Sequence, residues 1–245
     1  MQELLSFYLE KKSTLFLMPT PLWDQLLWDD FQVQFIEKML PFEPLILVES
    51  SKVLRKKWIG SGLPRDWINQ FVEYSEHNME EFAREVAKKI RAGKNALLFS
   101  DGGLPVFCDP GVHLVREIRL QGQKGSVHCL PFSNSAIQAL ILSGFSQNEF
   151  YFAGFLPQKK ELRENKWREI LLSNKTTILM ETPYRLSKTY NDLKRQQVLL
   201  NKKKLFWAFD LNSPREEHLW GDISSFSEER FQEKREFVLV IEGKI

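Results

Sequence analysis

Short apolar runs alternate with amphipathic stretches along the first half of the chain. Runs of four to eight apolar residues are typical of strands buried on both faces. Such runs occur at Ser13–Met18, Pro44–Val48, Phe71–Glu76, Ala96–Phe99 and Val127–Leu130. Before the fourth run, apolar residues recur three and four positions apart from Met79 to Ile90, which predicts a helix that ends at Gly93. This alternation predicts an α/β domain with a mainly parallel sheet.

The second half of the chain repeats the same classes of element without repeating the sequence. A helix is predicted from Ser133 or Asn134 to Gly144. The further helices predicted are Glu161–Leu172 and Arg185–Val198, and the strands are Phe150–Phe155, Thr176–Glu181, Lys204–Leu211, His218–Ile223 and Phe237–Glu242. The last three strands have no long helix between them, so we expect antiparallel pairing. We therefore predict two α/β domains, residues 1–132 with a mainly parallel sheet and flanking helices, and residues 133–245 with a mixed sheet.

A glycine loop follows the strand Ala96–Phe99. It holds the adjacent glycines Gly102 and Gly103 and leads to Asp109-Pro110, which we predict as the N-cap and first residue of the next helix, with Val112 facing inward. Adjacent glycines permit positive φ and let a ligand approach the backbone closely. A loop at the carboxyl edge of a parallel sheet is where such sheets bind ligands, although an ordinary strand-to-helix connection has the same pattern.

Composition excludes several classes of protein. The chain has 245 residues, 43% of them hydrophobic, and a net charge of +2, so any surface for nucleic acid must be a local patch. No apolar run approaches the roughly 20 residues that cross a bilayer, and the N-terminal segment lacks a signal-peptide pattern, so we expect a cytoplasmic protein. Two cysteines and four scattered histidines predict neither a disulfide framework nor a metal site.

Seven sequence blocks share their order and spacing with a known family. They are Met18–Pro21, Val48–Lys52, Glu76–Asn78, Ser100–Gly111, Gly154–Lys160, Glu181–Arg185 and Glu236–Gly243. Through these blocks the chain resembles the tetrapyrrole-methylase-type (class III) S-adenosylmethionine-dependent methyltransferases. It is most similar to the bacterial enzymes that methylate a ribose 2′-hydroxyl of small-subunit ribosomal RNA.

The resemblance implies a fold, a cofactor and a set of site residues. S-adenosylmethionine would lie in a cleft between the two domains, and the protein would be a homodimer. Lys52, Lys159, Lys160 and Arg185 would contact ribosomal RNA, and Glu49 would be the catalytic base that we test first. The residues that would hold the cofactor are Pro19, Asp101, Gly103, Leu104, Val106, Phe107, Asn134, Ser135, Met180, Glu181, Trp207 and Ala208.

Several blocks depart from the family pattern where ligands should bind. Leu104 and Val106 replace threonine and glycine, Lys52 replaces arginine, and Phe132 replaces a glycine. We expect the Phe132 ring to pack between the two domains rather than to fill the cofactor pocket. Three functions stay open: methylation of the usual RNA, methylation of a small-molecule acceptor, or binding of RNA or protein by a catalytically weakened relative.

Simpler interpretations exist for some of these residues. Lys159 and Lys160 lie in a charged stretch that includes Arg163 and also suits a solvated helix face. Glu181 and Arg185 are four residues apart, the spacing of an ordinary helical ion pair. Asp101 is also a suitable residue to cap a turn.

Overall fold

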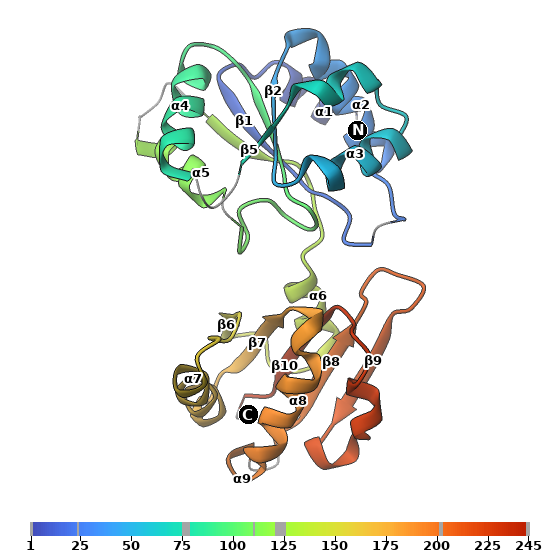
Figure 1. The fold of residues 1–245 in the computed structure, drawn as a ribbon, viewed down its shortest axis with the longest axis vertical. Coiled ribbons are helices and arrows are strands. Elements are labelled where there is room, and N and C mark those ends of the chain that lie inside the picture. The colour runs from blue at the N-terminus through green and yellow to red at the C-terminus, as the bar shows by residue number, and fades with distance from the viewer. Residues whose placement is uncertain are drawn as a thin grey trace. The chain divides into compact units, whose positions relative to one another are not determined.

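The structure, a computed structural model, describes residues 2–23, 25–74, 79–109, 111–120, 126–200 and 203–243, with only the backbone of Met79. The chain divides into two compact units, Met1–Ser133 and Asn134–Ile245 (Figure 1). Each unit has its own sheet and its own hydrophobic core.

The first unit is built on a sheet of five parallel strands. Its order is β3-β2-β4-β1-β5, with β4 in the centre. The strands are β1 (Thr14–Met18), β2 (Leu45–Val48), β3 (Phe71–Glu73), β4 (Ala96–Phe99) and β5 (Ser126–Cys129). Leu98 of β4 pairs with Leu47 of β2 and Leu17 of β1, and all four β4 residues are buried. The central strand therefore reads as a continuous apolar run because helices cover both of its faces.

Helices cover the two faces of this sheet in separate groups. Side chains of α1 (Gln2–Leu9), α2 (Asp30–Met39) and α3 (Ser51–Gly60) form one core with residues such as Phe16 and Phe99. Side chains of α4 (Met79–Arg91) and α5 (Val112–Leu120) form another with the opposite sides of the strands. Figure 1 shows the two groups on either side of the sheet.

The connections that leave β1 and β4 run to opposite faces. β1 leads to α2 in one core, whereas its neighbour β4 leads to α5 in the other. Adjacent parallel strands whose connections diverge in this way form a topological switch point, where the loops open a crevice at the carboxyl edge. The glycine loop follows β4 and therefore lies at this point.

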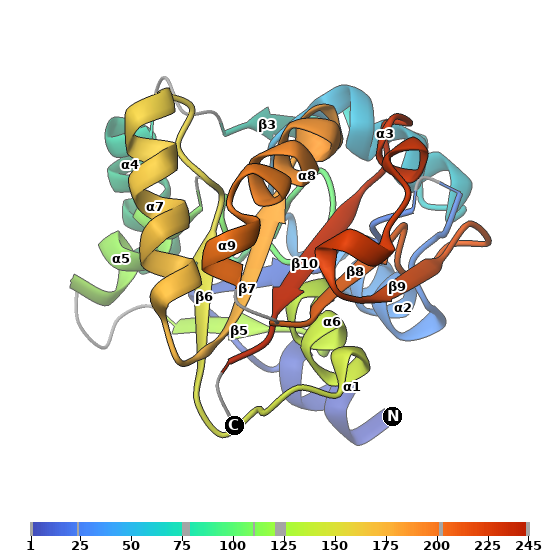
Figure 2. The ribbon, with the colours of Figure 1, turned by 90° about the horizontal axis from the view of Figure 1, so that it is seen from below.

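The second unit is built on a mixed sheet in the order β6-β7-β10-β8-β9. Its strands are β6 (Phe150–Gly154), β7 (Thr176–Glu181), β8 (Leu205–Phe209), β9 (Glu217–Gly221) and β10 (Phe237–Ile241). β6 and β7 are parallel and the remaining pairs are antiparallel. Figure 2 shows α7 and α8 beside strands of this sheet. The helices are α6 (Ser135–Ser143), α7 (Lys160–Leu172), α8 (Leu186–Arg195) and α9 (Gln197–Leu200).

The predicted elements are confirmed in most places, including the parallel sheet, the mixed sheet and the antiparallel late strands. Asn134 is the N-cap of α6, and its Oδ1 accepts a hydrogen bond from the Ile137 N–H at 3.1 Å. The pattern missed α1, α2 and α3, although Asp29 and Gln32 form a complete capping box at the start of α2.

The start of α5 differs from the prediction. This helix begins at Val112, so Asp109 is not its N-cap, and Pro110 lies outside the described residues. Val112 is half exposed rather than inward-facing, because Leu114 and Ile118 supply the buried face of α5. Residues 75 and 76 of the third predicted strand are also outside the described residues. None of the described helices is long and apolar enough to cross a membrane.

Candidate functional site

The loops after β1 and β4 are joined by two backbone hydrogen bonds at the switch point. The Thr20 N–H donates to the Gly103 carbonyl at 2.8 Å, and the Gly103 N–H donates to the Thr20 carbonyl at 2.7 Å. Gly103 has φ +83°, a conformation that favours glycine. Both backbone polar groups of Gly103 are thus engaged within the protein, so this residue fixes the shape of the loop.

The two glycines lie under an apolar side chain. A Cβ atom on Gly103 would lie 3.4 Å from Leu22 Cδ2, and one on Gly102 would lie 3.7 Å from the same atom. The Ser100 hydroxyl lies 3.3 Å from the carbonyl oxygens of both glycines and donates to them. Leu22 therefore covers the part of the loop that the resemblance assigned to the cofactor.

Val106 and Cys108 hold left-handed backbone conformations in the same loop. Their φ angles are +80° and +66°. A β-branched residue rarely adopts this region, at a cost of about 1–3 kcal/mol, so the surrounding structure must impose it. The family pattern has glycine at position 106. Val106 therefore has the left-handed backbone conformation that glycine would adopt at this position.

Three carboxylates gather at the carboxyl edge of the sheet. Glu49 follows β2, Asp101 follows β4, and Asp109 lies further along the glycine loop. Glu49 Oε2 accepts a hydrogen bond from the Asp101 N–H at 3.0 Å, and the Asp101 carboxylate accepts one from the Ser50 backbone. These bonds tie the end of β2 to the glycine loop.

The proximity of these groups changes the proton affinity of two of them. Burial and then the negative charge of Glu49 raise the pKa of Asp101 to about 6. Burial, Glu49 and Asp101 raise the pKa of Asp109 to about 7. Like charges in a partly desolvated site disfavour ionisation. The cluster therefore exchanges protons close to neutral pH.

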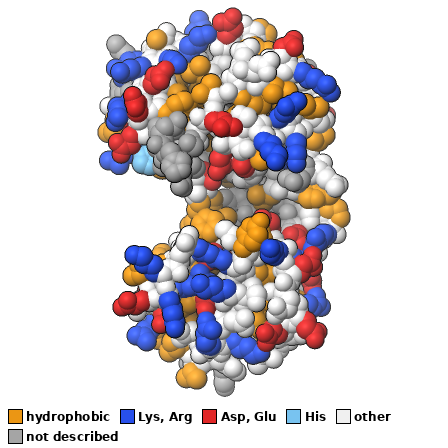
Figure 3. All heavy atoms as spheres, in the orientation of Figure 1, with side chains coloured by type: hydrophobic (Ala, Val, Ile, Leu, Met, Phe, Trp, Pro, Cys, Tyr) orange, Lys and Arg blue, Asp and Glu red, His pale blue; other side chains and the backbone are white. Residues whose placement is uncertain are grey.

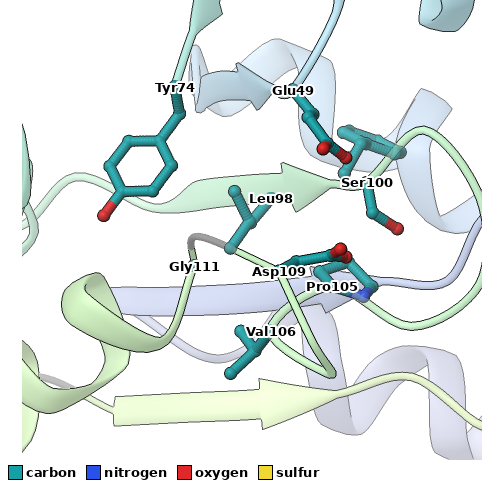
Figure 4. Close-up of a pocket in the computed structure, with 9 residues that line it drawn as sticks. Glu49, Tyr74, Leu98, Ser100, Pro105, Val106, Asp109 and Gly111 are labelled. Carbon is teal, nitrogen blue, oxygen red and sulfur yellow. The ribbon is translucent and has the colours of Figure 1, made fainter. Parts of the chain in front are cut away.

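A small cavity of about 10 Å³ separates these side chains. In Figure 4 the carboxylates of Glu49 and Asp109 and the hydroxyl of Ser100 point toward the same space. The cavity has room for about one water molecule. It is lined by Glu49, Tyr74, Leu98, Phe99, Ser100, Pro105, Val106, Asp109 and Gly111.

The cofactor residues expected in the second unit lie at different depths. Asn134 and Ser135 begin α6, and Met180 is half-buried near the end of β7. Trp207 and Ala208 lie within β8 and are fully buried, with the Trp207 ring in the core beside Phe231. The Trp207 Nε1 is buried and has no hydrogen-bond partner in the described part of the chain.

Glu181 takes part in a buried network of charges. Its carboxylate accepts hydrogen bonds from Arg163 Nη1 at 2.6 Å and from Arg185 Nη1 at 3.1 Å. Arg185 also donates to the Leu156 carbonyl at 3.0 Å. The ion pair between Glu181 and Arg185 is present, as their spacing suggested. Buried Arg163 adds a second cation to this carboxylate.

The lysines expected to contact RNA are all on the surface. Lys52 is exposed on α3, and Lys159 and Lys160 are exposed at the start of α7. Arg163, one turn further along α7, is only 2% exposed, so the interpretation of this stretch as a solvated helix face is wrong for Arg163. Its partners on β7 and α8 are distant in sequence and explain its burial.

Comparison with known proteins decides the family. Residues 49–226, more than half of the chain, match the family profile of Tetrapyrrole (Corrin/Porphyrin) Methylases. The chain belongs to this methylase family. The matched region contains Glu49, the glycine loop and the Glu181 network. The predicted family is therefore confirmed.

Relatives of this methylase family member include two proteins named ribosomal RNA small subunit methyltransferase I. The one from Haemophilus influenzae is 34% identical over 178 residues, which cover 71% of this chain and 62% of the relative. The one from Bacillus subtilis is 34% identical over 174 residues, 70% of this chain and 58% of the relative. The matched segment thus spans about 60% of the length of these relatives.

Solved structures confirm the methylase fold at low sequence identity. A conserved protein from Aeropyrum pernix has a TM-score of 0.63 at 15% identity, and the match covers 96% of this chain and 86% of that one. Diphthine synthase has a TM-score of 0.60 at 12% identity, covering 94% and 90% of the two chains. Uroporphyrin-III C-methyltransferase from Thermus thermophilus, solved with S-adenosyl homocysteine, has a TM-score of 0.53 at 15% identity, covering 94% and 96%.

The sequence did not predict some residues of the site at the carboxyl edge of the parallel sheet. Asp109 was assigned to a helix cap, and Tyr74 was given no role, yet both line the cavity. Asp109 belongs to the glycine-loop block, so its position in that block is the signal that could have found it. Phe132 lies at the end of the first unit and is 45% exposed, and its packing between the two domains stays a prediction. The described part of the chain contains no group of three or more His, Cys, Asp or Glu side chains that could hold a metal ion.

Proposed function

We propose that this chain is an S-adenosylmethionine-dependent methyltransferase that acts on a ribose 2′-hydroxyl of small-subunit ribosomal RNA. The observation that carries the proposal is the site at the switch point, where Glu49, Asp101 and Asp109 meet the glycine loop. Membership of a methylase family supports methyl transfer. The names of the two relatives described above support ribosomal RNA as the acceptor.

The residues at this edge fit S-adenosylmethionine in charge. The cofactor carries a sulfonium and an ammonium group besides a carboxylate. Glu49, Asp101 and Asp109 would complement the two cations, and a bound cation would favour the ionised forms of the two aspartates. Thr20 Oγ1 is buried beside Gly103 without a hydrogen-bond partner among the described residues, so it is available to a ligand. The cavity of about 10 Å³ admits only a small group, so most of the cofactor would lie along the open side of the loop.

The protein's own contribution is to hold the reactants and to accept a proton. A bound S-adenosylmethionine supplies a methyl group that is already a strong electrophile. Alignment of the reacting groups can lower the barrier by about 7–11 kcal/mol. Leu104 and Phe107 of the glycine loop would position the cofactor. Lys52, Lys159 and Lys160 would hold RNA phosphates.

Glu49 is the proposed acceptor of the ribose hydroxyl proton. One of its oxygens, Oε2, is engaged by the Asp101 N–H, and that bond fixes the orientation of the carboxylate. Asp101 and Asp109 have pKa values of about 6 and 7, which is the range in which a general base is most effective at neutral pH. They are therefore the alternative proton acceptors if Glu49 serves only to position the loop.

The decisive experiment measures cofactor binding and methyl transfer on the same protein. Calorimetry with S-adenosylmethionine should show binding, and a ligand concentration one hundred times Kd should stabilise the fold by about 2.7 kcal/mol. Transfer of a labelled methyl group to small-subunit RNA, followed by mapping of the modified nucleotide, identifies the acceptor. Binding without transfer to any RNA would favour a small-molecule acceptor. Absence of cofactor binding at millimolar concentration would favour a binding module without catalysis.

Two observations favour testing the two alternative functions, methylation of a small molecule and binding without catalysis. Leu22 covers the glycine pair, and Val106 occupies a left-handed position where the family has glycine. Both side chains add bulk to the predicted cofactor site. The predicted homodimer and cytoplasmic location remain proposals, and sedimentation analysis of the purified chain tests the first of them.

A further inference from the structure

A polar groove of about 190 Å³ lies between α7 and α8 in the second unit. The residues contributed by α7 are spaced at i, i+3, i+4 and i+7, and those from α8 follow a similar pattern, so each helix presents one face to the groove. The lining consists of Lys160, Arg163, Glu164, Trp167, Lys188, Asp192, Arg195 and Gln196. Apart from Lys160, none of the residues assigned to the site at the switch point lines this groove.

The floor of the groove is a rigid buried network. Arg163 Nε donates to Asp192 Oδ2 at 2.5 Å, and Trp167 Nε1 donates to the same oxygen at 3.2 Å. Arg163 also donates to Thr189 Oγ1 at 3.1 Å. Arg163 and Trp167 are 2% and 1% exposed. The floor therefore keeps its geometry without a ligand.

The charges of the lining are unequal. Lys160, Arg163, Lys188 and Arg195 are cationic, whereas Glu164 and Asp192 are anionic, which leaves an excess of two positive charges. Both oxygens of Asp192 are already engaged, Oδ1 by Arg195 and Oδ2 by Arg163. The groove is thus unsuited to a cation and suited to an anion.

Two lysines on the rim have exposed side chains that can reach a ligand. Lys188 is exposed and forms no hydrogen bond or ion pair with any described residue. Lys160 is 90% exposed in its side chain and lies 4.0 Å from Glu164, a weak pair. Figure 3 shows Lys and Arg side chains gathered on the face of the second unit that carries α7 and α8.

We propose that this groove binds phosphodiester groups of the RNA backbone. The inference rests on the proposed function, because it assumes that the chain binds RNA. Arg195 is bonded to Asp192 through one nitrogen, but its side chain is 71% exposed. Lys188 and Arg195 are seven residues apart on α8, a separation of about 10 Å along the helix axis. This distance exceeds the length of one nucleotide step, so the rim can contact more than one phosphate of a strand. Flexible lysines on an open rim suit contacts that position the backbone without reading bases.

A variant of the rim tests the groove against a matched control. Lys188→Ala removes a rim cation that has no other assigned role, whereas Lys194→Ala removes an exposed lysine of the same helix outside the groove lining. Binding of a small-subunit RNA fragment is measured by fluorescence anisotropy at several salt concentrations. The rim variant should weaken binding and reduce the slope of log K against log salt by about one unit. The control should keep the slope of the unaltered protein.

The indole N–H of Trp167 provides a local signal. This group lies in the groove floor, so the RNA fragment should shift its NMR resonance in the unaltered protein and in the control, but much less in the rim variant. Inorganic phosphate is titrated as a separate arm. A shift with phosphate but none with RNA identifies a free-anion site and overturns the proposal.

The remaining outcomes separate this inference from the proposed function. RNA binding with an equal salt slope in the rim variant and the unaltered protein overturns the groove alone. Complete absence of RNA binding by the unaltered protein overturns both the groove and the RNA part of the proposed function. Calorimetry with S-adenosylmethionine on the rim variant should give an unchanged Kd, which shows that the variant is folded.

Discussion

Glu49 Oε2 accepts a hydrogen bond from the backbone N–H of Asp101 at 3.0 Å. The bond joins the ends of two neighbouring strands, β2 and β4, across the carboxyl edge of the parallel sheet. It also brings the charges of two carboxylates close together, which contributes to the raised pKa of Asp101. The same contact therefore shapes the glycine loop and adds to the effect of burial, which is the larger cause of the raised pKa of Asp101.

Replacing Glu49 by glutamine separates these two roles. The Glu49→Gln side chain retains an oxygen that can accept from the Asp101 N–H but cannot take up a proton at neutral pH. We expect methyl transfer to fall by about 100- to 10,000-fold, with the Kd for S-adenosylmethionine changed only a few-fold. Glu73→Gln is the control, because Glu73 accepts a hydrogen bond from the Ser51 N–H at 2.9 Å but does not line the cavity. Equal activity of both variants would contradict a role for Glu49 as the base.

Asp109 should make the stability of the protein depend on pH. Its pKa is about 7 in the folded protein against an ordinary value of 3.8, so the folded state binds more protons than the unfolded state between these values. Stability is therefore lost as the pH rises from about 4 to 7. Asp109→Asn removes this effect, and its stability advantage over the unaltered protein should grow by about 1–2 kcal/mol between pH 5 and pH 8 after allowance for partial exposure.

Urea unfolding at the two pH values measures that difference. Asp66 is an exposed carboxylate on a short 3₁₀ helix, so Asp66→Asn is the control. This control should change the free energy of unfolding by less than about 0.5 kcal/mol at both pH values. An Asp109→Asn advantage that is the same at pH 5 and pH 8 would show that Asp109 is ionised normally in the folded protein.

The two adjacent glycines should respond differently to alanine. Gly103 has φ +83° and would place a Cβ atom 3.4 Å from Leu22, so Gly103→Ala should destabilise the fold by about 1–2 kcal/mol. Gly102 is not in a positive-φ conformation, and its Cβ would meet Leu22 at an ordinary 3.7 Å. Gly102→Ala should therefore be nearly neutral. Thermal unfolding of both variants tests the contrast, and similar melting temperatures would show that the loop does not require glycine at position 103.

Arg163 should be essential for the stability of the second unit. Its removal leaves the carboxylates of Glu181 and Asp192 buried with fewer partners, so Arg163→Ala should cost about 3–5 kcal/mol. The exposed pair of Lys89 and Glu85, 2.8 Å apart on α4, is a useful comparison. Lys89→Ala should cost no more than about 0.5 kcal/mol. Denaturant unfolding compares the two, and equal costs would mean that solvent reaches the Arg163 network.

The sequence by itself determined the order and type of most elements. Buried strands such as Ala96–Phe99 and capped helices such as the one that starts after Asn134 are local patterns, and local patterns are visible in one chain. Helix α2 was equally visible through its capping box and was overlooked. The apolar runs that precede Glu49 and the glycine loop correctly placed both at the carboxyl edge of the sheet.

Only the tertiary structure decided which charges are buried and which side chains meet. Arg163 has the sequence surroundings of a surface residue, yet partners on β7 and α8 enclose it. Asp109 gains its raised pKa first from burial and then from the charges of Glu49 and Asp101, which the pairing of β2 with β4 brings to the same edge. Val112 was expected to be buried and is half exposed. Periodicity reports how one element is patterned, whereas burial and proton affinity depend on neighbours that the fold brings from distant parts of the chain.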